Sequence, residues 1–221
     1  MLLMPWEVFE MYLSKVQLDT DNRQKIRNLT HLGAYHDWVE RSFPEEFAEG
    51  ERTRKLWRID HLGGKIYLLI VSREAPDLSA LCRYGVEGSA ETRNYDPFLS
   101  KLKKGMKCRF RTVLNPVVAV LDRSGKRGRI MPHVTVAHQM DYLKKRSEPH
   151  GFLLNDGEYG IKERDFVLWR KGKEHIRLSR VAYEGLLTIQ DTDLFRTLLT
   201  EGMGKKKAYG FGIMTVIPLE V

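Results

Sequence analysis

This 221-residue chain has few cysteines and no long apolar run. Its two cysteines, Cys82 and Cys108, lie far apart without metal-ligand spacing, which argues against a zinc knuckle or a disulfide framework. No apolar run approaches the ~18 residues of a membrane span, and residues 1–10 lack the charged and apolar regions of a signal peptide. We therefore expect a cytoplasmic protein. With 42% hydrophobic residues, it can bury one large or two small cores.

The positive charge is concentrated in the second half of the chain. The formal net charge is +8, but residues 1–100 hold 13 Lys/Arg and 16 Asp/Glu, whereas residues 101–221 hold 24 and 13. Such asymmetry is typical of a basic face for nucleic acid, because each phosphate contact releases counterions. From charge alone, a basic surface without a partner is an equal alternative.

Residues 202–212 combine four glycines with three consecutive lysines. Glycine lets backbone N–H groups approach a phosphate closely, and lysine supplies positive charge. A helix C-cap followed by a tight turn would explain one or two of the glycines, but not four. The candidate phosphate-contacting residues are Gly202, Gly204, Lys205, Lys206, Lys207, Gly210 and Gly212.

This segment does not match the common nucleotide motifs. The Walker pattern requires Lys-Ser or Lys-Thr after its last glycine, and the dinucleotide fingerprint has its third glycine where Lys207 stands. Both motifs connect a strand to a following helix, whereas here a helical pattern over 193–201 precedes a strand pattern over 211–219. The segment therefore favours an extended phosphate backbone over a mononucleotide, and we expect no cofactor.

The apolar periodicity predicts two similar series of elements. The first comprises a strand over 12–18, a helix over 22–43 that Gly33 weakens, strands over 55–60 and 65–72 around a turn at 61–64, a short helix over 76–82 and a strand over 92–95. This is the order of a ferredoxin-like βαββαβ unit.

The second series follows a polar passage over 96–105. It comprises a strand over 106–114, a helix over 134–145, hairpin strands over 166–169 and 175–179, a strand over 181–189, a helix over 193–201 and a strand over 211–219. We therefore predict an α+β chain with two tandem ferredoxin-like (RRM-like) βαββαβ domains, over residues 11–97 and 105–221.

Histidine is the first candidate for chemistry near RNA. Imidazole takes and gives a proton near neutral pH, as cleavage of RNA by its own 2′-hydroxyl requires. Of seven histidines, His36 lies on the first predicted helix. For any one histidine taken alone, a structural role is the more common one. His133 and His138 are five apart, which does not fit a helical metal pair, so we interpret both as structural and expect no metal.

Several motifs together resemble one known family. They are Met11-Tyr12-Leu13-Ser14-Lys15-Val16, His36 seven residues before Phe43-Pro44, Phe110-Arg111 with Asn115-Pro116, the strand containing Gly185, and the segment 202–212. In these respects the chain resembles CasE, the CRISPR RNA-processing endoribonuclease of the type I-E Cascade complex. The resemblance covers residues 11–221.

The resemblance implies a protein that grips a CRISPR repeat RNA hairpin, cuts it at its 3′ base without metal and joins other Cascade subunits. By the same resemblance, His36 is the catalytic histidine, moving a proton as the 2′-hydroxyl attacks the adjacent phosphorus. Some members carry a tyrosine three residues before this histidine, where this chain has Gly33. Tyr35 is the candidate substitute, although helix neighbours point about 100° apart.

The resemblance also implies where the RNA is held. By the resemblance, the hairpin tip presents Arg170, Lys171 and Lys173 to the RNA stem, and Arg111 and Asn115 line a cleft between the domains. A basic loop with Arg127 and Arg129 is a further predicted contact, taken from its charge alone and ranked below the hairpin. The alternative without RNA is that the hairpin tip and the basic loop are simply solvated, and that Asn115-Pro116 only ends a strand. Two other functions stay open: a non-catalytic RNA-hairpin-binding subunit of a ribonucleoprotein complex, and a ferredoxin-like regulator that binds a small ligand.

Overall fold

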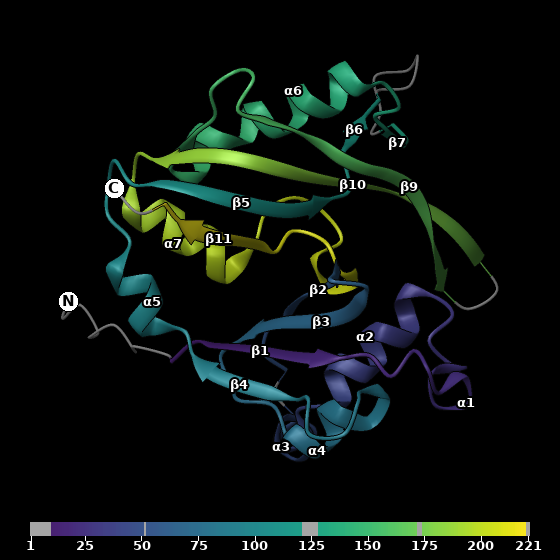
Figure 1. Cartoon of the computed structure of the whole chain (residues 1–221). Helices are drawn as coiled ribbons and strands as arrows, with labels where there is room; N and C mark the ends of the chain where they lie inside the picture. Colours follow the sequence, from purple (N-terminus) through teal and green to yellow (C-terminus); the bar gives the residue numbers. More distant parts are fainter. Residues whose placement is uncertain (1–9, 51, 121–127, 172–173, 220–221) are drawn as a thin grey trace, which may run out of the picture.

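Two antiparallel sheets, joined by a shared core, organise the computed structural model (Figure 1), which describes residues 10–50, 52–120, 128–171 and 174–219. The N-terminal sheet has the strand order β2-β3-β1-β4. Its strands are β1 (Tyr12–Gln17), β2 (Leu56–Leu62), β3 (Lys65–Ser72) and β4 (Glu91–Asn94). The order and the antiparallel pairing are those of the ferredoxin-like unit predicted from the sequence.

The helices of this half are shorter than predicted. They are α1 (Arg23–Ile26), α2 (Leu32–Arg41), α3 (Pro44–Glu49), α4 (Leu78–Leu81), the 3₁₀ turn η1 (Cys82–Tyr84) and α5 (Asp96–Lys101). The single helix predicted over 22–43 is wrong, because His31 is extended (φ −158°, ψ 161°) and separates α1 from α2. Asn28 and Thr30, just before the break, have low helix propensity.

The C-terminal sheet repeats the same order, β11-β5-β10, and continues with β8 and β9, which pair different parts of β10. The elements are β5 (Lys107–Leu114), β6 (Val117–Ala119), β7 (Ile130–Pro132), α6 (Val136–Ser147), η2 (Glu148–His150), β8 (Phe152–Leu153), β9 (Tyr159–Lys171), β10 (Glu174–Ile189), α7 (Thr192–Glu201), η3 (Lys207–Tyr209) and β11 (Met214–Pro218). The strands predicted separately over 175–179 and 181–189 form one strand, β10.

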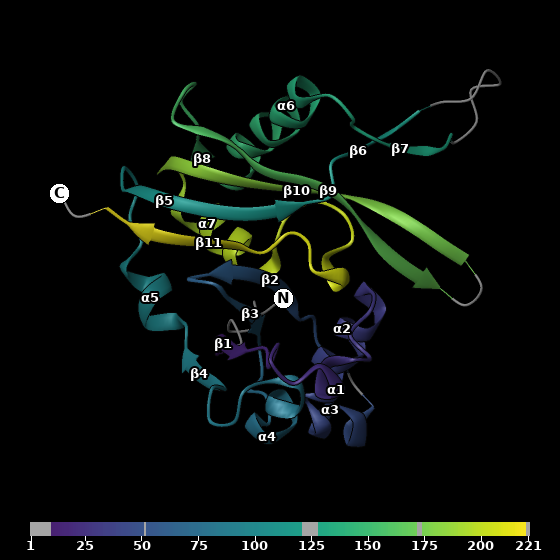
Figure 2. The same ribbon diagram turned by 45° about the vertical axis from the view of Figure 1, so that its right-hand side comes forward.

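The hairpin of β9 and β10 extends beyond the rest of its sheet and reaches α2 (Figures 1 and 2). One side of it packs in an apolar cluster with the glycine-rich segment, since Trp169 and Leu178 are buried together with Phe211. Leu32 at the start of α2 packs against the same cluster. The helix α2, which carries His36, is thereby held beside the C-terminal half of the chain.

The apolar core spans both sheets. Leu56 and Val71 of the N-terminal sheet belong to the same buried cluster as Leu114 and Met214 of the C-terminal sheet. A second cluster seats α2 on its own sheet through Trp38 and its neighbours. The Trp38 indole Nε1 also donates a 3.1 Å hydrogen bond to the carbonyl oxygen of Leu81. These contacts fix the orientation of α2.

Both cysteines are free thiols, and burial raises the pKa of Cys108 to about 11. Among the helices that the structure describes, none is long and apolar enough to cross a membrane.

Candidate active site and RNA interface

The imidazole of His36 lies against the glycine-rich segment. His36 stands in the second turn of α2, and its side chain is 31% exposed. The centroid of its ring is 5.1 Å from that of Tyr209, at an interplanar angle of 54°. Tyr209 ends η3, within the segment 202–212. The two features that the sequence singled out, one from each half of the chain, therefore meet.

Glycines in this segment allow the backbone to pack closely against neighbouring groups. Gly210 has φ +84°, and a Cβ there would come within 2.7 Å of the Trp57 ring. Gly212 has φ +92°, and its N–H donates a 2.8 Å hydrogen bond to the carbonyl oxygen of Val113. Gly202 follows α7, and its N–H donates to the carbonyl oxygen of Leu198. A helix cap therefore accounts for Gly202, tight packing against Trp57 of β2 for Gly210, and close approach to the carbonyl oxygen of Met203, 2.5 Å from a Cβ, for Gly212.

The three lysines occupy three different environments. Lys205 is exposed. Lys206 is the one non-glycine with positive φ (66°) among the described residues, and its Nζ lies 3.6 Å from the centroid of the Trp169 ring. Lys207 donates from Nζ to the carbonyl oxygens of Glu201 (2.8 Å) and Gly202 (3.3 Å). Burial lowers the pKa of Lys207, and the charge of Arg54 lowers it further. Lys207 thus stabilises the end of α7, whereas Lys206 places its ammonium over Trp169, 5.7 Å from the ring centroid of Tyr209.

Two aromatic residues that sequence reasoning did not assign connect the hairpin to this site. The rings of Trp169 and Tyr209 are 5.0 Å apart in an edge-on arrangement. Their positions in the sequence could have indicated this role in part, since Tyr209 lies in the glycine-rich segment and Trp169 directly precedes the basic tip of the hairpin. At Gly33, a Cβ would lie 3.6 Å from the carbonyl oxygen of Arg170 and 3.0 Å from the ring of His31. A larger residue at position 33 would therefore force the His31 ring to move, whereas the approach to the hairpin at Arg170 is an ordinary van der Waals contact.

Tyr35 packs beneath the same segment. Its ring stacks on that of Trp57 at 5.9 Å and 20°, and burial raises the pKa of its phenol. The indole Nε1 of Trp57 donates a 2.9 Å hydrogen bond to the carbonyl oxygen of Ala208. Tyr35 therefore supports Trp57, which in turn supports the segment that carries Tyr209.

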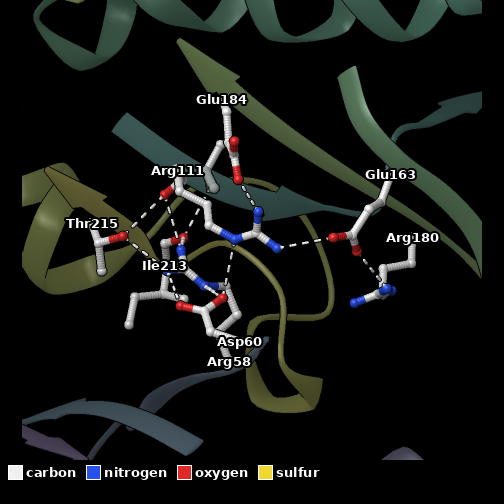
Figure 3. A network of polar contacts seen from close by, with 9 residues as sticks. Arg58, Asp60, Arg111, Glu163, Arg180, Glu184, Ile213 and Thr215 are labelled. Carbon is white, nitrogen blue, oxygen red and sulfur yellow. Dashed lines mark hydrogen bonds and ion pairs between the residues drawn. The ribbon is translucent and has the colours of Figure 1, made fainter. Parts of the chain in front are cut away.

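Arg111 lies between the sheets and is surrounded by carboxylates (Figure 3). It pairs with Asp60 (3.2 Å), Glu163 (3.5 Å) and Glu184. Burial alone would lower the pKa of Arg111, but Asp60 and Glu184 raise it above the ordinary value. Three carboxylates therefore already balance the positive charge of Arg111, which the sequence analysis predicted to contact RNA.

The neighbouring Arg58 ties the two sheets together. Its guanidinium is 1% exposed and binds both carboxylate oxygens of Asp60, at 2.7 and 2.6 Å. It also donates to the carbonyl oxygens of Arg111 (2.9 Å) and Ile213 (3.2 Å), and to the hydroxyl of Thr215 (2.8 Å). These bonds run from β2 to β5 and β11, so the network holds the halves of the molecule in place.

The remaining predicted contacts are dispersed. Asn115 is 4% exposed, and its side-chain oxygen has no hydrogen-bond partner among the described residues. Arg129 and Arg170 are exposed. Lys171 pairs with Glu174 through the backbone at the end of the hairpin. Gly204 has φ +82° and approaches the hydroxyl of Tyr142. The predicted contacts Arg127 and Lys173 lie outside the described residues.

His133 and His138 contact each other, with ring centroids 5.7 Å apart. Burial lowers the pKa of His133, and the neighbouring His138 contributes to the effect. Within the described part of the chain, no group of three or more His, Cys, Asp or Glu side chains could hold a metal ion.

A model of the family described as "CRISPR associated protein" matches residues 11–218. The chain belongs to this family. It is 30% identical over 220 residues to the CRISPR-associated endoribonuclease Cse3 of Thermus thermophilus, covering 94% of this chain and 100% of that protein.

Solved structures of this CRISPR-associated family have the same fold. Thermus thermophilus Cse3 bound to an RNA representing a pre-cleavage complex gives a TM-score of 0.78 at 28% identity, covering 95% of this chain and 100% of that one. Cas6e of Escherichia coli gives a TM-score of 0.65 at 22% identity, covering 94% of this chain and 100% of that one. Together with the strand orders, these likenesses confirm the two ferredoxin-like units of this CRISPR-associated chain.

The candidate site of this CRISPR-associated protein places an imidazole against a lysine-bearing segment. An imidazole that is partly exposed can accept and return a proton. The ammonium groups of Lys205 and Lys206 lie on the segment that His36 touches, where they can balance charge that develops on a phosphate.

Proposed function

We propose that this chain is an endoribonuclease that cleaves CRISPR repeat hairpins in precursor transcripts without metal and stays bound to the product. The observation that carries the proposal is the contact between His36 and Tyr209, which sets a proton-transfer group against a lysine-bearing segment. Similarity over nearly the whole chain to the endoribonuclease Cse3 supports the same function.

In the proposed reaction, His36 moves a proton as the 2′-hydroxyl attacks the adjacent phosphorus. The bond from phosphorus to the 5′-oxygen breaks, leaving a 2′,3′-cyclic phosphate and a 5′-hydroxyl. General acid–base assistance of this kind typically contributes about 10²–10⁴-fold. In-line placement of the hydroxyl and the charges of Lys205 and Lys206 would contribute the rest.

The hairpin of β9 and β10 is the proposed grip on the RNA stem, through Arg170, Lys171 and Lys173. The narrow, deep major groove of A-form RNA favours phosphate and shape contacts, with base contacts limited to slim insertions. We further propose that Arg111 acts as a link between the sheets. The division into domains over 11–97 and 105–221, a cytoplasmic site of action and assembly with other Cascade subunits are parts of the same proposal.

The test is incubation of the protein with end-labelled repeat RNA in EDTA. Cleavage to a cyclic-phosphate end supports the enzyme. Tight binding without cleavage would instead support a non-catalytic RNA-binding subunit. Neither cleavage nor binding, with affinity for a small ligand that hardly depends on salt, would support a regulator.

Two of the three lysines, Lys205 and Lys207, should differ in their effects on RNA binding. We expect Lys205→Ala to weaken binding and to reduce the slope of log K against log salt by about one, because one phosphate contact is lost. Lys207→Ala should leave that slope unchanged and lower the melting temperature, since its ammonium binds carbonyl oxygens at the end of α7. Filter binding over a series of salt concentrations measures the slope, and equal slopes for Lys205→Ala and the native protein would contradict the assignment.

A further inference from the structure

A carboxylate lies one helical turn beyond His36. Glu40 is four residues along α2, so it shares a face with the imidazole. One of its oxygens, Oε1, is 3.8 Å from Nδ1 of His36, and the other, Oε2, is 3.5 Å from Nζ of Lys55. The Glu40 side chain is only 15% exposed, so solvent screens these contacts weakly.

Lys55 holds this carboxylate from the other side. Its side chain is 1% exposed, and its ammonium pairs with Glu46 and donates a 3.2 Å hydrogen bond to the carbonyl oxygen of Thr53. The ammonium also lies 4.8 Å from the centroid of the Phe43 ring. A buried cation with this many partners has little freedom to move. It therefore anchors the carboxylate that faces His36.

The imidazole is thus bounded on two sides. Glu40 faces the edge that carries Nδ1, and Tyr209 contacts the ring. A carboxylate at Nδ1 favours the tautomer with the proton on that nitrogen, which leaves Nε2 on the opposite edge as the proton acceptor.

We propose that Glu40 is a positioning residue for His36: held by Lys55, it fixes the orientation and tautomer of the imidazole so that Nε2 faces the RNA. The inference rests on the proposed function, because it assigns Nε2 to the proton transfer. A competing explanation is that Glu40 only balances the buried charge of Lys55. Glu46 also pairs with Lys55, so the two explanations predict different results when Glu40 is changed.

The first experiment compares Glu40→Ala and Glu40→Gln with Asp37→Ala under single-turnover conditions. Asp37 is a matched control, because it lies on the same helix next to His36, carries the same charge and forms an exposed pair with Arg41. For Glu40→Ala we expect the cleavage rate constant to fall about 10–100-fold, part of the 10²–10⁴-fold that proton transfer contributes, with RNA affinity unchanged. Glu40→Gln should recover part of the rate, since its amide oxygen can accept a hydrogen bond from Nδ1–H. Asp37→Ala should cleave at the native rate.

The second experiment measures the tautomer of the His36 imidazole directly. The ¹⁵N shifts of His36, assigned by comparison with His36→Ala, report which nitrogen carries the proton. We expect the Nδ1–H form to dominate in the native protein and in Glu40→Gln, and a mixture of both tautomers in Glu40→Ala. This readout does not require RNA.

The outcomes separate this inference from the proposed function. If the native protein does not cut repeat RNA, the proposed function fails, whereas the tautomer of His36 still tests the role of Glu40. Native cleavage by Glu40→Ala, or a loss of stability and RNA affinity with unchanged ¹⁵N shifts, would overturn the positioning role.

Discussion

Replacing His36 by alanine should lower the rate constant for cleavage of repeat RNA by about 10²–10⁴-fold, the usual contribution of general acid–base catalysis. RNA affinity should stay nearly unchanged, because the binding energy is expected to come from phosphate contacts at the lysines and the hairpin. Single-turnover cleavage and filter binding on the same protein preparation measure the two effects.

The matched control for this substitution is His61→Ala. His61 is an exposed histidine near the end of β2, and it has no role in the proposed site. We expect it to cleave at the native rate. Unchanged cleavage by His36→Ala would remove His36 from the reaction, and a parallel loss of RNA affinity would show that it acts in binding.

Replacing Arg58 by methionine should lower the free energy of unfolding by about 3–5 kcal/mol, as expected when one partner of a buried ion pair is removed. The substitution leaves Asp60 without its two close hydrogen bonds and removes one of the donors to each of the carbonyl oxygens of Arg111 and Ile213. Urea denaturation followed by circular dichroism measures the change.

Arg41→Met is the control for the network. Arg41 pairs with Asp37, but the two side chains are 59% and 61% exposed, and exposed pairs contribute about 0–1 kcal/mol. Equal stability of Arg58→Met and Arg41→Met would show that the network between the sheets contributes little.

Much of the fold could be predicted from alternating and helical apolar patterns. Those patterns locate most strands and both long helices of the C-terminal half, because burial on one face leaves a period in the sequence. The break before α2 was missed, since the apolar spacing continues through residues 27–31 while His31 is extended. The length of β10 was missed because the polar residues around Arg180 interrupt the apolar pattern that marks a strand.

The site could be predicted only in part. His36 and the segment 202–212 could be proposed as site residues because each carries a local motif. Their contact through Tyr209 depends on how two distant segments pack, and no local pattern encodes it. The same reason hid Glu40, whose importance depends on Lys55, and the acidic partners of Arg111, which come from three other strands.

The most direct test of the central claim is a crystal structure of the protein with repeat RNA that carries a 2′-deoxy nucleotide at the scissile position, which blocks the attack. We predict the scissile phosphate within hydrogen-bond reach of His36, with Lys205 and Lys206 beside it. An RNA strand bound instead between the sheets, along Arg111 and away from His36, would contradict the account.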